Sequence, residues 1–372
     1  MLSRLQITRF RNFDQAEVSL APGFNCLVGR NGQGKTNLLE AVYYLSLLRS
    51  FRTSEINDLR QWKAALFSLK ATIVDSSGLE TELFVGYGTE RRLKINETPV
   101  YRASDFINQF LCVSFIPDDL RLVQGAPQLR RRFLDIAASQ ASPEYLRHLQ
   151  AYQEGLHSRN VMLRNQQKYP RAMITAYDKS IAREGAFLEY ARRDFVCQLN
   201  GILSEQSPIL LQDDRRISLK YLSRINGILL QESNGTQEEL EQLLLKTLTE
   251  NYQRDCVQGY TTAGPHRADF SCLLGNVSMQ RYSSQGECRL ASLALRLACL
   301  RLLAEKRGSG SITLLIDDVI GELDFQRRTA FFNMISGLGQ CLFACTELPP
   351  SLPRPDRVIK VSAGSLMVSE SL

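Results

Sequence analysis

The hydrophobic positions divide the chain into three stretches, a helical one between two that are rich in short, strand-like runs. Near the N-terminus apolar residues fall in short runs, and the last of these, Phe24–Val28, predicts a strand that ends at Gly29. Leu38, Leu39, Val42 and Leu45 then follow at helical spacing. Residues 65–116 return to short runs broken by Asp- and Gly-containing turns, a rhythm typical of an antiparallel β meander.

The middle of the chain has the period of helices. Ser142-Pro143-Glu144 has the capping hydroxyl, the proline and the early acid of a helix start. Thr236 and Glu239 have the spacing of a capping box before an apolar stripe. We therefore predict a mainly helical insertion over residues 119–258.

Strands return after Gly259, around one helix expected near residues 285–305. The apolar runs 312–316 and 341–345 are typical of buried strands, the proline-rich stretch 349–355 of a loop, and residues 358–361 of a short final strand. The sequence thus predicts an α/β fold. Residues 1–118 and 259–372 form one split head that includes the antiparallel β meander, and residues 119–258 form an inserted, mainly helical second domain.

Composition narrows the class of protein. Of 372 residues, 44% are hydrophobic and 23% charged, which excludes a mainly disordered chain. We expect no membrane span, because no run of about 18 apolar residues occurs, and no secretory signal. Nine cysteines without paired CxxC modules predict no structural zinc and place the protein in a reducing cytoplasm. A net charge of +6 permits an anionic partner without requiring one.

The strongest motif is a phosphate-binding loop between the first apolar strand and its helix. It comprises Gly29, Arg30, Asn31, Gly32, Gln33, Gly34, Lys35 and Thr36, and it fits the pattern G-x-x-x-x-G-K-[ST]. Glycines let backbone N–H groups surround a β-phosphate, and the helix N-terminus adds a favourable dipole. We expect Lys35 to contact the β- and γ-phosphates of ATP and Thr36 to ligate Mg²⁺.

Two acids follow a later apolar strand, as in a Walker B site. We expect Asp317 to hold the Mg²⁺ through water and Asp318 to polarise the attacking water. Taken alone, the pattern also fits a buried strand that happens to end in acids.

A second phosphate-binding surface is expected at the start of the helix near residue 285. Ser284 and Glu287 have the spacing of a capping box, with Gln285 and Gly286 between them. A helix start with a hydroxyl and a glycine favours phosphate binding. The alternative is an ordinary, well-capped core helix.

The order of these parts resembles ABC-type ATPase heads, with Asp324 in a following Gly-Glu-Leu-Asp run. That resemblance implies two subunits paired head to tail, in which the Ser284 helix of one covers the γ-phosphate held by the other. ATP would join a homodimer, and hydrolysis would release it.

The chain also resembles the RecF family nearly end to end. The segments that carry this resemblance are Arg9-Phe10-Arg11-Asn12-Phe13, Ser50-Phe51-Arg52-Thr53, Phe115-Ile116-Pro117-Asp118-Asp119-Leu120, the run from Gly125 to Asp135 with Arg130-Arg131-Arg132, and Gly264-Pro265-His266-Arg267-Ala268-Asp269. The resemblance implies a weakly ATP-hydrolysing DNA-binding protein that helps load recombinase at single-strand gaps with RecO and RecR, and that supports replication restart and the SOS response.

Several positions depart from the expected patterns. Glu287 stands where the family usually has Gln, and Ala268 where it usually has Asp. Cys345-Thr346-Glu347 occupies the place of the switch histidine of ABC transporters, and Pro117-Asp118 occupies the place of their Q-loop glutamine. The last two departures fit the family and favour slow hydrolysis.

DNA contact is expected from lysine and arginine, since phosphate contacts supply most sequence-independent affinity. The candidates are Arg4, Arg9, Arg11, Arg49, Arg52, Arg60, Lys63, Arg159, Arg164, Lys168 and Arg171. For each of these residues the alternative is an exposed side chain that contacts only solvent. For Arg130–Arg132, packing against Asp118, Asp119 or Asp135 is as good a hypothesis as DNA contact. His266 and Arg267 could sense the nucleotide or fix a turn, and the structural role is favoured.

Other classes of protein fit less well. A transporter energy subunit would need the switch histidine and the Q-loop glutamine, which this sequence does not have at those positions. An SMC- or Rad50-type tether would need a longer insertion for its coiled coil. A nuclease of the overcoming-lysogenisation type would need an added metal-binding domain. A scaffold that binds ATP without hydrolysing it stays open.

Overall fold

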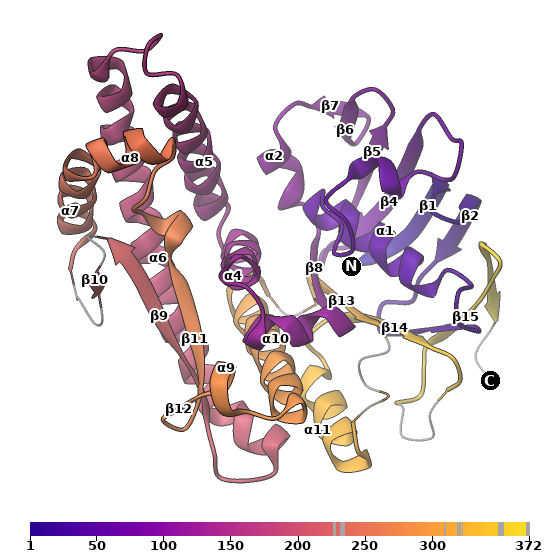
Figure 1. Cartoon of the computed structure of the whole chain (residues 1–372). Coiled ribbons are helices and arrows are strands. Elements are labelled where there is room, and N and C mark those ends of the chain that lie inside the picture. The colour runs from indigo at the N-terminus through magenta and orange to yellow at the C-terminus, as the bar shows by residue number, and fades with distance from the viewer. Residues whose placement is uncertain are drawn as a thin grey trace. The chain divides into compact units, whose positions relative to one another are not determined.

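The computed structural model describes residues 1–225, 228–230, 235–308, 310–317, 321, 323–348 and 353–369. It divides into two compact units (Figure 1). The first combines Met1–Asp119 with Arg296–Leu372, and the second is Leu120–Leu295. The expected boundary after residue 258 differs from this division, because residues 259–295 belong to the second unit. None of the described helices is both long and apolar enough to cross a lipid bilayer.

The first unit contains an antiparallel sheet with the strand order β2-β1-β4-β5-β6-β7. Its strands are β1 (Leu2–Phe10), β2 (Phe13–Ser19), β4 (Phe67–Val74), β5 (Glu80–Tyr87), β6 (Arg91–Ile95) and β7 (Thr98–Val100). Along β4, buried residues alternate with partly exposed ones, as expected for a sheet with one covered face. The predicted meander is therefore confirmed up to Val100.

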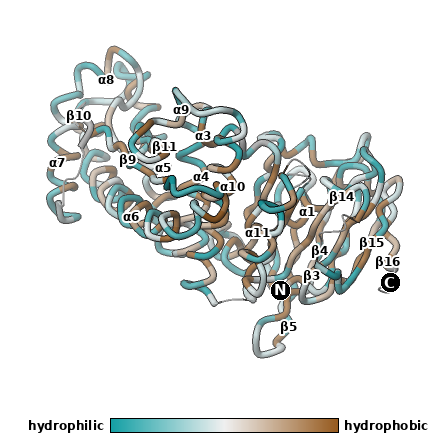
Figure 2. Tube along the Cα trace, turned by 90° about the horizontal axis from the view of Figure 1, so that it is seen from below, coloured by the Kyte–Doolittle hydropathy of each residue, from teal (hydrophilic) through white to brown (hydrophobic). Residues whose placement is uncertain are grey.

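The second sheet of this unit is mostly parallel, with the order β16-β15-β3-β14-β13-β8. Its strands are β3 (Phe24–Val28), β8 (Leu111–Phe115), β13 (Ile312–Asp317), β14 (Gln340–Cys345), β15 (Arg357–Ser362) and β16 (Ser365–Ser369), of which β16 is antiparallel to β15. Figure 2 shows the hydrophobic run of β3 and β14 in brown. Cys341 and Cys345 are buried on β14, as small apolar residues of a core strand.

Beyond Val100 the structure differs from the expected meander. Residues 103–107 form helix α2 (Ala103–Ile107), and β8 pairs in parallel with β13. Every residue of β8 is buried. A strand covered on both faces is continuously apolar, which is the usual pattern of a parallel sheet.

Helix α1 (Lys35–Leu47) packs against strands of both sheets, including β13 and β4. Almost all of it from Leu38 onward is buried, because sheets lie on both of its sides. The other described α-helices that lie wholly in this unit are α2 and α11 (Phe325–Ile335).

The second unit is mainly helical, as predicted. Its helices are α3 (Arg121–Gln124), α4 (Pro127–Ala141), α5 (Pro143–Arg164), α6 (Arg171–Leu211), α7 (Gln237–Glu250), α8 (Tyr252–Gln258), α9 (Met279–Tyr282) and the first part of α10 (Gln285–Arg307). A short 3₁₀ helix of this unit lies at Pro265–Arg267, whereas the one at Ile56–Leu59 belongs to the first unit and the one at Pro117–Leu120 crosses the boundary in the chain. Both predicted caps are present: Ser142 accepts the backbone N–H of Tyr145, and Thr236 and Glu239 form a reciprocal capping box.

The second unit also contains strands. Those within residues 217–230 lie where helix was predicted, whereas those within residues 269–278 lie where strands were expected to return after Gly259. Strands β9 (Ile217–Ile225), β10 (Ile228–Leu230), β11 (Asp269–Leu274) and β12 (Val277–Ser278) form a sheet in the order β10-β9-β11-β12. Strand β9 pairs with β11, which lies about fifty positions later in the chain. The local sequence of β9 does not show this pairing, so a strand could not be predicted there.

Two sequence motifs meet in the second unit. Arg130 on α4 makes a bidentate ion pair with Asp269 at 2.8 and 2.9 Å, and Arg131 donates to the carbonyl of Ala268 at 2.9 Å. The partner of Arg130 is therefore Asp269, a residue that was not among the partners considered from sequence. Arg130 is buried, so it serves the packing of this unit.

Candidate nucleotide site

The phosphate-binding loop connects β3 to α1, as the sequence predicts. Gly32 and Gly34 have φ values of 80° and 116°, a region that favours glycine. A Cβ on Gly34 would lie 2.6 Å from Nδ2 of Asn12, so a side chain there would also displace Asn12. The loop thus needs these glycines for its curvature.

Lys35 is the first residue of α1, and only 9% of it is exposed. Its Nζ donates to the carbonyl oxygens of Gly29 at 2.6 Å and Arg30 at 3.1 Å. The ammonium therefore lies within the loop, beside the helix N-terminus, where both charges favour an anion.

Thr36 and Asp317 come together from positions 281 residues apart. The Thr36 hydroxyl donates to Oδ1 of Asp317 at 3.1 Å, and Asp317 is buried at the end of β13. A hydroxyl and a carboxylate are oxygen donors of the kind that Mg²⁺ takes in phosphate sites. These two residues fit the metal role expected of them.

The second Walker B acid, Asp318, lies outside the described residues. Arg30, Asn31 and Gly32 are exposed on the loop.

Asn12 and the β15–β16 turn hold the phosphate-binding loop from outside. The carbonyl of Gln33 accepts the side-chain amide of Asn12 at 3.0 Å and the N–H of Gly364 at 3.3 Å. The Gln33 side chain accepts the N–H of Ala363 at 2.7 Å. Gln33 is therefore a structural member of the loop in this arrangement.

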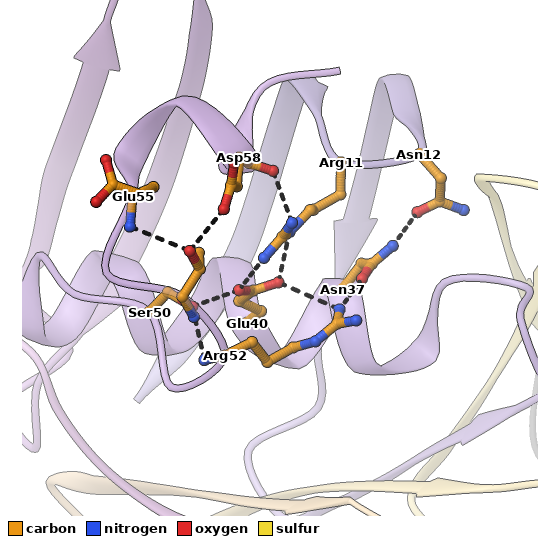
Figure 3. A network of polar contacts seen from close by, with 9 residues as sticks. Arg11, Asn12, Asn37, Glu40, Ser50, Arg52, Glu55 and Asp58 are labelled. Atoms are coloured by element: carbon orange, nitrogen blue, oxygen red, sulfur yellow. Dashed lines mark hydrogen bonds and ion pairs between the residues drawn. The ribbon is translucent and has the colours of Figure 1, made fainter. Parts of the chain in front are cut away.

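A polar network continues from the loop along α1 (Figure 3). Glu40 is fully buried and accepts two hydrogen bonds from Arg11, at 2.9 and 2.7 Å. Ser50 donates to Glu40 at 2.5 Å, and Arg52 lies 3.6 Å from it. Because a buried carboxylate needs such partners, these contacts tie residues 11–12 and 50–53 to the helix that follows the loop.

The sequence analysis missed the role of Asn12 and Glu40. The available signal was a single acid within the otherwise apolar run of α1, which usually indicates a buried, paired carboxylate.

In the second unit, Ser284 and Glu287 cap the start of α10. The Ser284 hydroxyl accepts the N–H of Glu287 at 3.2 Å, and the Glu287 carboxylate accepts the N–H of Ser284 at 3.0 Å. The predicted capping box is therefore present. Gln285 and Gly286 are exposed there, and the helix start borders a pocket of about 540 Å³ lined by Arg121, Gln124, Gly125, Ala126, Leu129, Gln285, Cys288 and Arg289.

Glu287 has a cationic partner in the same unit. Arg215 donates to Oε1 of Glu287 at 2.7 Å and also pairs with Asp213 at 2.8 Å. The backbone N–H of Ser284 and then the Arg215 guanidinium lower the pKa of Glu287. The carboxylate therefore stays ionised, and its charge is shared with Arg215.

Asp324 caps α11 in the first unit. Its carboxylate accepts the N–H of Arg327 at 2.8 Å and forms an ion pair with the Arg327 side chain at 2.8 Å. The backbone hydrogen bond from Arg327 is the main cause of a lowered pKa of Asp324.

Several of the arginines expected to contact DNA already have partners within the protein. Arg159 is fully buried and pairs with Asp178 and Asp255, each at 2.7 Å, so it is removed from the set. Arg11 and Arg52 belong to the Glu40 network, and Arg4 pairs with Glu17. His266 and Arg267 contact Tyr152 and Tyr260, in agreement with a structural role.

The comparison with a family model covers most of the chain. Residues 1–361 match the RecF/RecN/SMC N terminal domain. The chain is 35% identical over 99% of its length to the DNA replication and repair protein RecF of Symbiobacterium thermophilum, covering 98% of that protein. It is 33% identical to RecF of Ruminiclostridium cellulolyticum, with 93% of each chain covered.

Solved structures agree with this assignment. The recombination mediator protein RecF-ATP of the RecFOR pathway superposes with a TM-score of 0.90 at 27% identity, covering 99% of this chain and 97% of that one. The Smc head domain of Pyrococcus furiosus, at 14% identity and a TM-score of 0.56 over 99% of this chain and 95% of that one, shares the fold. The fold is that of an ABC-type P-loop ATPase head with a helical insertion. With its glycine loop, its paired Thr36 and Asp317 and its full-length relatives, the chain belongs to the RecF family of DNA replication and repair proteins.

Proposed function

We propose that this protein is an ATP-dependent DNA-binding factor of recombinational repair, whose slow ATP hydrolysis resets it. The observation that carries the proposal is the meeting of Thr36 and Asp317 at 3.1 Å beside the Lys35 ammonium. A hydroxyl, a carboxylate and a lysine at a helix N-terminus are the groups that bind a Mg²⁺–nucleotide complex.

Each residue has a distinct part in binding the nucleotide. The backbone N–H groups of the loop and of the first turn of α1 bind the β-phosphate. Lys35 would exchange its carbonyl partners for the β- and γ-phosphate oxygens, the Thr36 hydroxyl would ligate Mg²⁺, and Asp317 would hold the metal through water. When bound, the metal neutralises charge that develops on the phosphate oxygens.

Slow hydrolysis follows from the groups that surround the reacting phosphate. The sequence offers Asp318 as the acceptor of a proton from the attacking water. Thr346 and Glu347 follow β14 where a transporter ATPase has its histidine. With fewer groups to orient water, turnover is expected to be low.

A second copy of the chain completes the site. Ser284–Glu287 in one subunit provides the helix start that binds the γ-phosphate held by the partner, with Asp324 near the same junction. Pairing brings two basic surfaces together on duplex or gapped DNA without sequence reading. The RecFOR pathway of the structural relative supports RecO and RecR as partners in loading recombinase.

The test is nucleotide-dependent light scattering with MgATP, MgADP or no nucleotide, repeated with a gapped duplex. Lys35→Met removes a charged donor, so we expect MgATP affinity to fall about 10- to 100-fold and ATP-dependent dimers to disappear. Lys94→Met, which removes a partly exposed lysine of β6 that pairs with Glu97, is the matched control. Undiminished dimers of Lys35→Met would refute the assignment of the loop.

A non-hydrolysing scaffold is the second candidate, since Asp318 is known only from sequence. Phosphate release with and without DNA separates the two. Turnover that is lost in Asp318→Asn while ATP-bound dimers persist supports the ATPase, whereas no turnover in the unmodified protein supports the scaffold.

A further inference from the structure

One exposed turn of the first unit combines an aromatic ring with unpaired positive charge. Trp62 is 87% exposed, and it is the one tryptophan of the chain. Lys63 follows it, and Arg9 lies on the neighbouring backbone segment; both are exposed. Among the described residues, none makes a side-chain hydrogen bond or ion pair with Arg9, Trp62 or Lys63.

The turn is held firmly although its side chains are free. The N–H of Ala64 donates to the carbonyl of Gln61 at 2.9 Å, and the N–H of Gln61 donates to the carbonyl of Arg9 at 2.8 Å. Lys63 has a φ of 65°, where glycine or asparagine is usual. A lysine in such a conformation is consistent with a use for its side chain.

The turn is also linked to the polar network of the first unit. The N–H of Arg11 donates to the carbonyl of Leu59 at 2.8 Å, and the guanidinium of Arg11 donates to the carbonyl of Asp58 at 2.6 Å and to buried Glu40 (Figure 3). The ring of Trp62 is therefore presented from a backbone that is fixed to α1. A fixed platform loses little conformational freedom when a flat ligand stacks on it.

The charges beside the ring favour a phosphate-bearing partner. Arg9 and Lys63 offer two cations without a described counterion. The nearby carboxylate of Asp58 already accepts the Thr53 hydroxyl at 2.7 Å. An exposed aromatic ring on a turn that also carries cations is a combination with which proteins bind single-stranded nucleic acid, since the ring stacks a base and the cations contact the backbone.

We propose that the Trp62 turn stacks an unpaired nucleobase of gapped DNA, while Arg9 and Lys63 contact the adjoining phosphates. Bases inside a duplex are stacked on each other, so their faces are not open to the indole ring. The turn therefore recognises the single-stranded side of a gap. This inference rests on the proposed DNA binding and specifies which part of the DNA the first unit meets.

Trp62 itself is the probe. Because the chain has a single tryptophan, its emission reports only this turn. We would titrate the full-length protein with MgATP against oligodeoxythymidylate of about 12 nucleotides and against a blunt duplex, with binding followed in parallel by anisotropy of labelled DNA. Quenching with the single strand, and little change with the duplex, is expected.

Variants separate stacking from charge. Trp62→Ala should weaken single-strand binding about 5- to 100-fold, and Trp62→Phe should retain most of it. Tyr101→Ala, which removes another exposed aromatic ring of the same unit, should have no effect. Lys63→Asn keeps a residue that tolerates positive φ, and it should reduce the salt dependence of binding by about one phosphate contact.

The outcomes distinguish this inference from the proposed function. If anisotropy shows single-strand binding while Trp62 emission and Trp62→Ala affinity stay unchanged, the stacking proposal is overturned and DNA binding stands. If no DNA form binds any variant or the unmodified protein, the proposed function itself fails. If Trp62→Ala keeps its DNA affinity but loses binding to purified RecR, the turn is a protein-docking site and the inference is wrong.

Discussion

Glu287 lies at the start of the helix that is proposed to act in trans, where the resemblance to the RecF family leads us to expect glutamine. An added negative charge close to a γ-phosphate opposes its binding. In the structure the Glu287 carboxylate caps α10 and is paired with Arg215 at 2.7 Å. We infer that Arg215 compensates the charge that glutamate brings in place of glutamine.

This compensation can be tested by a pair of substitutions. Arg215→Ala should weaken ATP-dependent pairing about 5-fold, the size of one exposed ion pair, while leaving thermal stability nearly unchanged. Glu287→Gln added to that variant should restore pairing, because the uncompensated charge is gone while the amide can still cap the helix. Light scattering against MgATP concentration measures both. Normal pairing of Arg215→Ala would contradict the idea.

At the scale of elements, the loop before β11 is fastened to two helices of the second unit. Arg130 and Arg131 on α4 bind Asp269 and Ala268, and His266 contacts Tyr152 on α5 at 2.6 Å. The Nε2 of His266 lies 3.0 Å from the carbonyl of Thr261, which can only accept, so Nε2 carries the proton and Nδ1 accepts from Tyr152. The histidine is neutral in this arrangement.

The neutral histidine predicts a pH dependence of stability. Burial lowers the pKa of His266 from 6.5 to about 4, and Arg267, Arg131 and Arg192 add to that effect. Between these values the unfolded chain binds a proton that the folded chain does not, so stability falls as pH decreases from about 7 to 5, by about 2 kcal/mol. Urea unfolding at the two pH values should show this loss, and His266→Gln should reduce it. An equal loss in both proteins would assign the slope to other groups.

At the scale of the whole molecule, the two units carry different parts of the proposed composite site. The phosphate-binding loop, Asp317 and Asp324 belong to the first unit, and Ser284–Glu287 belongs to the second. The proposed head-to-tail pairing would make each nucleotide site from the first unit of one chain and the second unit of another. A chain altered in the phosphate-binding loop or in Ser284–Glu287 should therefore be rescued by a partner chain in which that same segment is intact.

Complementation tests this arrangement. Ser284→Arg should bind ATP as a monomer but fail to pair, and Lys35→Met should bind ATP about 10- to 100-fold more weakly and also fail to pair by itself. A mixture of the two should form dimers with one intact site, since the Ser284→Arg chain supplies the loop and the Lys35→Met chain supplies the helix start. We expect up to about half of the normal turnover per chain. A mixture as inactive as its components would exclude a site shared between chains.

Features built from neighbouring residues could be predicted from sequence. The glycine loop, the caps at Ser142, Thr236 and Ser284, and the helix after the loop depend on contacts a few positions apart, and all were confirmed. Such elements follow from backbone geometry and local hydrogen bonds, which the order of residue types specifies.

Partners that are distant in the chain were decided only by the tertiary structure. Arg130 pairs with Asp269, 139 positions away, and Arg159 is buried between Asp178 and Asp255 instead of exposed. Strand β9 formed where helix was expected, and β8 joined the parallel sheet. The physical reason is that an arginine or a short apolar run has the same local pattern whether it is exposed or buried. The free energy of burying and pairing it depends on which distant carboxylate or strand the fold brings within reach.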